Sequence, residues 1–324
     1  MKILYGLPPH HQLDITRIVL KHCVRQNIVV IPKGDNDRAY LYTDPIPNVL
    51  KRITVINDEG VETIIDCAHQ GYIDLTTQKV YTDDIPAFIK EIYPYDLDDA
   101  SNAAIENKLK EIHTSLKLVY GNMTQEFPEQ GMAMRFLTGN EKVLEIGANV
   151  GRNSLLIHSI LSKKGNSNFV TLESDAGIAS QLKENRDANH MNFQIEASAL
   201  SKRKLIQRGW DTIVSDDILP GYHSVQTITL AELRNKYKIA FDTLILDCEG
   251  AFYYILTDMP DILDNINLII MENDYYNEEH KTFIDEAMTK KGLKRVYVQN
   301  GGWECRHYNK FPNTYMNFFE VWQK

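Results

Sequence analysis

The sequence predicts an α/β fold, a mostly parallel sheet with helices on both faces, preceded by a small β-rich domain. Three observations predict it. From residue 142 onward, short apolar runs alternate with amphipathic segments, as in parallel strands joined by crossover helices. A glycine-containing turn follows the first of these runs. The last segment, 315–322, is aromatic and β-branched with no helix after it, which predicts an antiparallel last strand.

Length and charge limit the classes of function. The chain has 324 residues, enough for one large or two modest domains. The formal net charge of −9, without a long Lys/Arg stripe, argues against a protein whose main role is binding nucleic acid. Four widely spaced cysteines form no C-x-x-C pair, so a zinc ribbon is not indicated. No apolar run is long enough for a membrane span and the N-terminus does not resemble a signal peptide, so we expect a cytoplasmic protein.

Residues 1–98 are predicted to form the small β-rich domain, of mixed α+β type. A polar seam at 96–99 ends it, and a connector helix begins at Ser101 or Asn102 with apolar residues along one face. We expect this domain to recognise substrate or to join copies of the chain into a homo-oligomer. Its expected elements are a helix over 18–24, a strand over 28–31, a turn over 33–37, and two hairpins over 53–67 and 72–81.

The second domain, 99–324, is predicted to contain the alternating strands and helices. The polar stretch 201–228 does not fit the alternation and is a candidate substrate loop. The expected strands are 142–146, 169–173, 193–197, 243–247, 268–272 and 294–298, and the expected helices are 153–162, 176–189, 230–236, 251–259 and 278–290.

The turn after the first strand of this domain carries the most information. Glu145 lies near the strand end, and Gly147 and Gly151 let the backbone approach a ligand that a Cβ would exclude. The pattern is neither the G-x-G-x-x-G dinucleotide fingerprint nor a P-loop. An acidic group beside the turn would repel a pyrophosphate. It suits a cationic ligand, and the sulfonium and amine of S-adenosylmethionine fit that description.

Later strands also end in polar or small residues, at the edge where ligands bind in such sheets. Glu173, followed by Ser174, is placed to accept hydrogen bonds from ribose hydroxyls. Ser198 and Ala199 leave room for a flat ring. One acid at a strand end often only caps the next helix, but five strand ends of this kind indicate a binding site.

The segment from about 125 to 324 resembles the FkbM family of S-adenosylmethionine-dependent methyltransferases. The family pattern D-x-G-A-N-x-G appears as EIGANVG at 145–151, V-x-x-x-T-L-D as VQTITLA at 225–231, and D-x-E-G-x-E as DCEGAF at 247–252. The departures are Glu145, Ala231 and Phe252, of which the first keeps the charge. The resemblance implies a Rossmann-like class I methyltransferase sheet and an O-methyltransferase acting on a sugar, nucleotide-sugar or glycan. It does not extend to the first domain.

For such an enzyme, we expect the glycine turn to line the methionine end of the donor, Glu173 to hold the ribose, and Ser198 and Ala199 to border the adenine. The predicted donor-binding residues are Glu145, Gly147, Asn149, Gly151, Asn153, Glu173, Ser174, Ser198, Ala199 and Asp247.

Methyl transfer from a sulfonium is an in-line displacement, and a sugar hydroxyl is a poor nucleophile until it loses its proton. We expect Asp247 to act as the base or to orient the acceptor, with Glu249 as its partner and Glu272 at the next strand end. Alternatively, Asp247, Glu272 and Asn273 could hold Mg²⁺ or Mn²⁺, which would lower the pKa of a bound hydroxyl.

Two other functions stay open at this point. One is a methyltransferase acting on protein or nucleic acid, because residues 202–208 contain a local basic patch. The other is a non-catalytic binding module. His223 and His307 are alternative bases, and Tyr275, Tyr276 and Trp303 are aromatic side chains suited to stacking.

Overall fold

The computed structural model describes residues 1–93, 99–275, 277–301 and 317–324. The chain divides into two compact units, Met1–Asp99 with Gln299–Phe318, and Ala100–Val298 with Phe319–Lys324. None of the helices in the described ranges has the length and apolar composition needed to cross a membrane.

The first unit contains two four-stranded sheets, with strand orders β2-β1-β5-β6 and β3-β4-β7-β8. Both predicted hairpins are confirmed, since β5 pairs antiparallel with β6 and β7 with β8. The sequence did not predict β1 and β2. The elements are β1 (Lys2–Leu7), β2 (His11–Asp14), α1 (Thr16–His22), β3 (Val24–Arg25), β4 (Ile28–Ile31), α2 (Asp35–Tyr42), β5 (Arg52–Ile56), β6 (Glu62–Ile65), β7 (Gly71–Asp74), β8 (Val80–Tyr81) and α3 (Ala87–Ile92).

The prediction of a turn over 33–37 is wrong in part, because helix α2 begins at Asp35. Asp35 and Asp37 stand in its first turn, where the helix dipole favours negative charge. Arg38 of this helix is fully buried and donates hydrogen bonds to the carbonyl oxygens of Pro32 and His69, each at 2.8 Å. The tertiary structure therefore stabilises a helix in a segment whose composition favours a turn.

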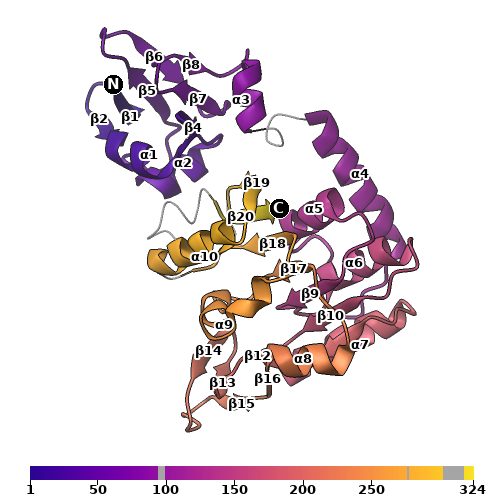
Figure 1. The fold of residues 1–324 in the computed structure, drawn as a ribbon. Helices are drawn as coiled ribbons and strands as arrows, with labels where there is room; N and C mark the ends of the chain where they lie inside the picture. Colours follow the sequence, from indigo (N-terminus) through magenta and orange to yellow (C-terminus); the bar gives the residue numbers. More distant parts are fainter. Residues whose placement is uncertain (94–98, 276, 302–316) are drawn as a thin grey trace. The chain divides into compact units, whose positions relative to one another are not determined.

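The second unit contains a seven-stranded sheet of order β11-β10-β9-β17-β18-β20-β19 (Figure 1). Strands β11, β10, β9, β17 and β18 are parallel, and β20 is antiparallel to β18. The predicted Rossmann-like α/β sheet with an antiparallel last strand is confirmed. The strands are β9 (Val143–Ile146), β10 (Phe169–Leu172), β11 (Gln194–Glu196), β17 (Thr243–Leu246), β18 (Leu268–Glu272), β19 (Lys294–Gln299) and β20 (Phe319–Gln323).

Capping residues set several of the helix starts. Asp175 accepts hydrogen bonds from the backbone N–H groups of Gly177 and Ile178, and Thr229 forms a capping box with Glu232. Helix α5, which begins with Pro128 in its first turn, was not predicted. The helices are α4 (Asp99–Ser115), α5 (Phe127–Phe136), α6 (Arg152–Ser162), α7 (Ala176–Ala188), α8 (Leu230–Tyr237), α9 (Phe252–Asp258), the 3₁₀ helix η1 (Pro260–Leu263) and α10 (Glu278–Lys290).

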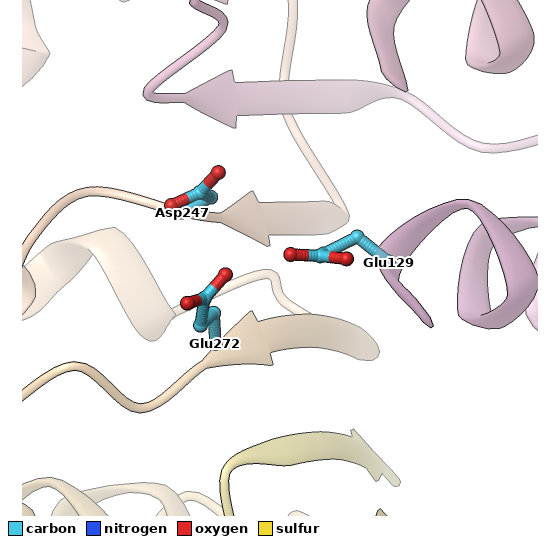
Figure 2. Close-up of side chains that lie close together, drawn as sticks. All are labelled: Glu129, Asp247 and Glu272. Carbon is cyan, nitrogen blue, oxygen red and sulfur yellow. The ribbon is translucent and has the colours of Figure 1, made fainter. Parts of the chain in front are cut away.

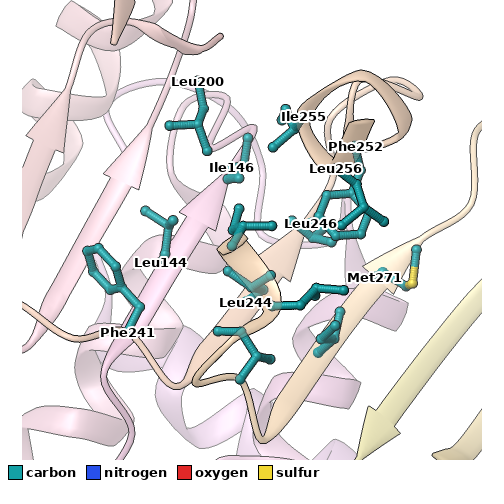
Figure 3. Packing of buried hydrophobic residues seen from close by; sticks show 14 of the residues in the cluster. Leu144, Ile146, Leu200, Phe241, Leu244, Leu246, Phe252, Ile255, Leu256 and Met271 are labelled. Atoms are coloured by element: carbon teal, nitrogen blue, oxygen red, sulfur yellow. The ribbon is translucent and has the colours of Figure 1, made fainter. Parts of the chain in front are cut away.

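The core of this unit packs the sheet against its helices. All residues of β9, β10 and β17 are buried, as expected for parallel strands covered on both faces. Figure 3 shows Leu246 of β17 beside Phe252 and Leu256 of α9, which follows that strand. The polar residues in these buried strands, Glu145 among them, therefore need partners inside the fold.

The stretch 201–228 is folded, which corrects its description as a loop. It contains a three-stranded antiparallel sheet of order β14-β13-β15, bordered by the parallel pair β12 and β16. Its polar composition concealed the strands because most of their residues face solvent. They are β12 (Ala199–Leu200), β13 (Leu205–Arg208), β14 (Asp211–Val214), β15 (His223–Val225) and β16 (Thr227–Ile228).

Candidate active site

The loop between β9 and α6 lies where the strand order reverses, since the chain continues to β10 on one side of β9 and later returns to β17 on the other. Ligands of doubly wound sheets bind at this point. The N–H groups of Gly147 and Ala148 both donate to the carbonyl oxygen of Leu172, each at 3.0 Å. Gly147 has a φ of +90°, and an ideal Cβ on it would lie 1.5 Å from the carbonyl oxygen of Asp247. Only glycine fits there.

Glu145 lies beneath this loop and is 2% exposed. Its carboxylate accepts hydrogen bonds from the hydroxyls of Ser154 on α6 and Thr171 on β10. Burial raises the pKa of Glu145 to about 7, although the two hydroxyls favour the ionised form. These contacts join β9 to its neighbours. The contact of Glu145 with a donor stays a prediction.

Glu173 follows β10 and joins the loop to the next helix. Its carboxylate accepts hydrogen bonds from the backbone N–H groups of Asn149 and Asp175, each at 2.9 Å. Burial raises the pKa of Glu173, while these bonds lower it. Each carboxylate oxygen has a second lone pair, so Glu173 can also accept hydrogen bonds from ribose hydroxyls.

The remaining predicted donor residues lie near the same strand ends. Ser198 is buried and donates a hydrogen bond to Glu196 at 3.1 Å, while Ala199 begins β12 and is partly buried, as is Ser174. Asn153, in the first turn of α6, is 7% exposed. Its Oδ1 has no hydrogen-bond partner within the described ranges.

Three carboxylates converge at the ends of β17 and β18. Glu129 comes from α5, Asp247 follows β17 and Glu272 ends β18. One carboxylate oxygen from each lies within 4.8 Å of the other two, and Figure 2 shows the three groups facing one another. The sequence predicted Asp247 and Glu272 at this site and missed Glu129. The signal that could have found it was Pro128 beside an acid, which marks a helix start.

Glu129 raises the pKa of Asp247 and of Glu272. Burial is the largest cause for Asp247 and for Glu272, and Glu129 and the neighbouring acids add to it. Both pKa values lie well above the ordinary range, because burial disfavours the ionised carboxylates and the nearby like charges add to this effect. The cluster can therefore hold a proton more readily than ordinary carboxylates do, pass one on, or bind a positively charged group.

Two neighbouring acids extend the cluster. Asp274 is 3% exposed and accepts a hydrogen bond from the N–H of Gly250 at 3.0 Å. Burial raises its pKa to about 7, with Glu249 as the next cause. Glu249 is exposed, has a φ of +50° and also raises the pKa of Asp247. Its role as the partner of Asp247 stays a prediction. Asn273 is fully buried, and Glu129 adds a third carboxylate to Asp247 and Glu272 that the sequence had not indicated.

No family model matches this sequence, and no curated protein matches it. Solved structures do match. An O-methyltransferase from Bacillus cereus in complex with SAH is 14% identical, with a TM-score of 0.36 over 73% of this chain and 96% of that chain. A ribosomal protein L11 methylase from Lactobacillus delbrueckii subsp. bulgaricus is 13% identical, with a TM-score of 0.38 over 64% and 81%. At these identities and TM-scores the comparisons assign no function to this chain. Its function has to be inferred from the geometry of its own site.

Tyr275 and His223 are the other candidate residues in the described part of the chain. Tyr275 is 2% exposed within the hydrophobic core, so it is not free to stack on a ligand. His223 is exposed on β15, and its Nε2 lies 3.9 Å from Asp175, beside the ribose-binding Glu173 of the prediction. Tyr276, Trp303 and His307 lie outside the described residues.

Proposed function

We propose that the protein is an S-adenosylmethionine-dependent O-methyltransferase acting on a hydroxyl of a sugar, a nucleotide-sugar or a glycan. One observation carries the proposal. The glycine loop at the switch point of the sheet contacts the backbone of Asp247, whose side chain belongs to the carboxylate cluster. A donor bound along the loop would therefore bring its reactive end beside acids able to take a proton from an acceptor.

The donor site is assigned by charge. The acids at these strand ends raise one another's pKa, and this environment disfavours a pyrophosphate. A sulfonium and an ammonium group supply the missing positive charge. Glu173 is held by two backbone N–H groups beside the loop, in a position that suits a ribose.

The acceptor proton is assigned to Asp247, with Glu249 as its partner. A carboxylate with a raised pKa is a stronger base than an ordinary aspartate, so it removes a hydroxyl proton more readily. Glu272 and Glu129 face Asp247 and can share that proton.

A divalent cation is the alternative to a free base. Glu129, Asp247 and Glu272 form a set of oxygen donors of the kind that Mg²⁺ and Mn²⁺ prefer, so the residues present fit such an ion. Bound there, the ion would lower the pKa of a coordinated hydroxyl. Glu129 thus joins the ligands proposed from the sequence, Asp247, Glu272 and Asn273.

The acceptor class follows from the resemblance to the FkbM family. A nucleic-acid acceptor is less well supported, because cations of the basic patch form ion pairs: Arg203 with Asp258 at 2.6 Å and Lys204 with Asp216 at 3.2 Å. A protein acceptor is the second candidate. The first domain is proposed as an accessory domain for acceptor recognition or self-association. Deleting residues 1–98 should abolish that property and leave donor binding intact.

Calorimetry with S-adenosylhomocysteine tests the donor, and absence of binding would overturn the proposal. Mass spectrometry of glycans from cells with and without an active copy tests the acceptor, since one methyl adds about 14 Da. Asp247→Asn should lower turnover by roughly 10²–10⁴-fold. Activity that persists in EDTA assigns the chemistry to the carboxylate base. Activity lost in EDTA and restored by Mg²⁺ or Mn²⁺ assigns it to the metal-bound cluster.

A further inference from the structure

Residues 117–126, which we call the strap, connect α4 to α5 and are anchored to α7. Asn185 accepts hydrogen bonds from the N–H groups of Val119 and Tyr120 at 2.7 and 3.0 Å, and donates to the carbonyl oxygen of Tyr120 at 2.9 Å. Asn189 accepts from the N–H of Lys117 at 2.8 Å and donates to its carbonyl oxygen at 2.7 Å. Two asparagine side chains thus hold the strap through its backbone N–H and carbonyl groups.

The strap also contacts the glycine loop. Asn185 donates to the carbonyl oxygen of Val150 at 2.8 Å, so one side chain bonds both segments. Gly121 has a φ of +88°, and an ideal Cβ on it would lie 2.9 Å from Val150. Arg152 donates to the carbonyl oxygen of Asn122 at 3.2 Å and to Gln125 at 2.6 Å. The strap therefore lies directly against the loop assigned to the methionine end of the donor.

The end of the strap presents Glu126 to this loop. Its Oε1 accepts hydrogen bonds from Arg152 at 2.5 Å and from the side-chain amide of Asn149 at 3.3 Å. Within the described residues, both hydrogen bonds of this carboxylate fall on Oε1, which leaves Oε2 for another donor. Burial raises the pKa of Glu126 to about 7, although Arg152 favours the ionised form.

Glu126 is better placed than Glu145 to meet a ligand. Glu145 is 2% exposed and already accepts two hydroxyl hydrogen bonds, whereas 16% of the Glu126 side chain is exposed. Glu126 also lies near enough to Glu145 and Asp247 to raise the pKa of each. It therefore contacts the loop through Asn149 and acts electrostatically on the carboxylate cluster.

We infer that Glu126 receives the α-ammonium group of the donor's methionine moiety, with Arg152 positioning the carboxylate and the strap. This inference rests on the proposed function. The acid that binds the ammonium group thus lies in the strap, before β9, and not in the glycine turn that follows β9.

The test is a double-mutant cycle in which the ligand is one of the changed partners. The two ligands are S-adenosylhomocysteine, which carries the ammonium but no sulfonium, and its desamino analogue. Calorimetry measures both with the wild type and with Glu126→Gln in the full chain. The wild type should bind S-adenosylhomocysteine at least 10-fold more tightly than the desamino analogue. In Glu126→Gln the two affinities should agree within about 2-fold, as expected when one charge-assisted bond is removed.

Glu126→Asp keeps the charge and should retain a preference for the ammonium, which covers the case where Glu126→Gln fails to fold. Glu184→Gln is the matched control, because Glu184 bonds Tyr120 of the strap at 3.0 Å on its exposed side. It should bind both ligands as the wild type does. A 10-fold preference that survives in Glu126→Gln overturns the inference. Wild-type protein that binds neither ligand overturns the proposed function, and the inference with it.

Discussion

The Cα of Gly147 faces the carbonyl oxygen of Asp247, so closely that an ideal Cβ would lie 1.5 Å from that oxygen. This contact joins the glycine loop after β9, the proposed donor site, to the end of β17, where the proposed base stands. The two functional parts of the site are therefore adjacent through backbone atoms, which cannot move aside as a flexible side chain can.

Gly147→Ala should prevent donor binding and destabilise the protein. The methyl group would displace backbone atoms, and the φ of +90° disfavours alanine. We expect a loss of at least about 2 kcal/mol in the free energy of unfolding, measured by urea denaturation. Gly165→Ala is the control, with a φ of +67° and nothing within 4 Å of the added Cβ. It should cost about 1–2 kcal/mol, and equal losses for the two variants would contradict the steric argument.

Glu173→Ala should weaken S-adenosylhomocysteine binding by roughly 10-fold or more, since a charge-assisted hydrogen bond contributes about 1.5–3 kcal/mol. Titration calorimetry measures the effect. Asp175→Asn is the control, because asparagine caps a helix as well as aspartate does and Asp175 caps α7. Unchanged affinity in Glu173→Ala would remove Glu173 from the ribose site.

The ligand-free protein should lose stability as the pH rises from about 4.5 to about 7. The pKa of Glu145 is raised from 4.5 to about 7 in the folded state. The folded protein therefore binds more protons than the unfolded chain in this window, so the free energy of unfolding falls as the pH rises. A tenfold difference in proton affinity between the folded and unfolded states corresponds to about 1.4 kcal/mol. Urea denaturation at pH 5 and pH 8 measures the change.

Glu145→Gln should reduce this pH dependence, because the titrating group is removed while an acceptor oxygen remains for Ser154 or Thr171. Glu106→Gln, at an exposed position on α4, should leave it unchanged. A pH dependence identical to that of the wild type in Glu145→Gln would refute this assignment.

Lys281→Met should destabilise the second unit by up to about 3–5 kcal/mol, because it removes one of the two cations that compensate a buried charge. Glu320 of β20 is fully buried and accepts hydrogen bonds from Lys281 at 2.9 Å and from Arg295 at 2.7 Å. Lys291→Met removes an exposed ion pair with Asp264 and should cost at most about 1 kcal/mol. Thermal and urea unfolding measure the stability of both variants. Similar losses in the free energy of unfolding would show that burial of the ion pair does not determine the effect.

The sequence predicted the sheet of the second unit well, because the spacing of hydrophobic residues and the positions of glycines in turns are local signals. Strands β9, β10, β17 and β18 are short buried runs, and each predicted range overlaps the observed one. The first unit was predicted less completely. Helix α2 was taken for a turn, since Asp35 and Asp37 favour turns until Arg38 is buried by distant carbonyl groups.

The candidate site also combines residues that local sequence signals predict with residues that only distant contacts bring in. Strand-end reasoning brought Asp247 and Glu272 together because parallel strands end at one edge of a sheet. It could not find Glu129, which reaches the cluster from α5, or Glu126, which ends the strap beside the glycine loop, because both lie before β9 in the sequence.

By itself, the sequence determined the strand-and-helix alternation, the glycine turn and the acids at the strand ends, because each depends on neighbours a few residues apart. The tertiary structure decided which acids meet. It buried Glu145 under the loop, moved Glu129 to within 4.8 Å of Asp247 and Glu272, and paired Glu126 with Arg152. These outcomes depend on contacts between distant segments, whose electrostatic cost and benefit arise only when folding removes the carboxylates from water.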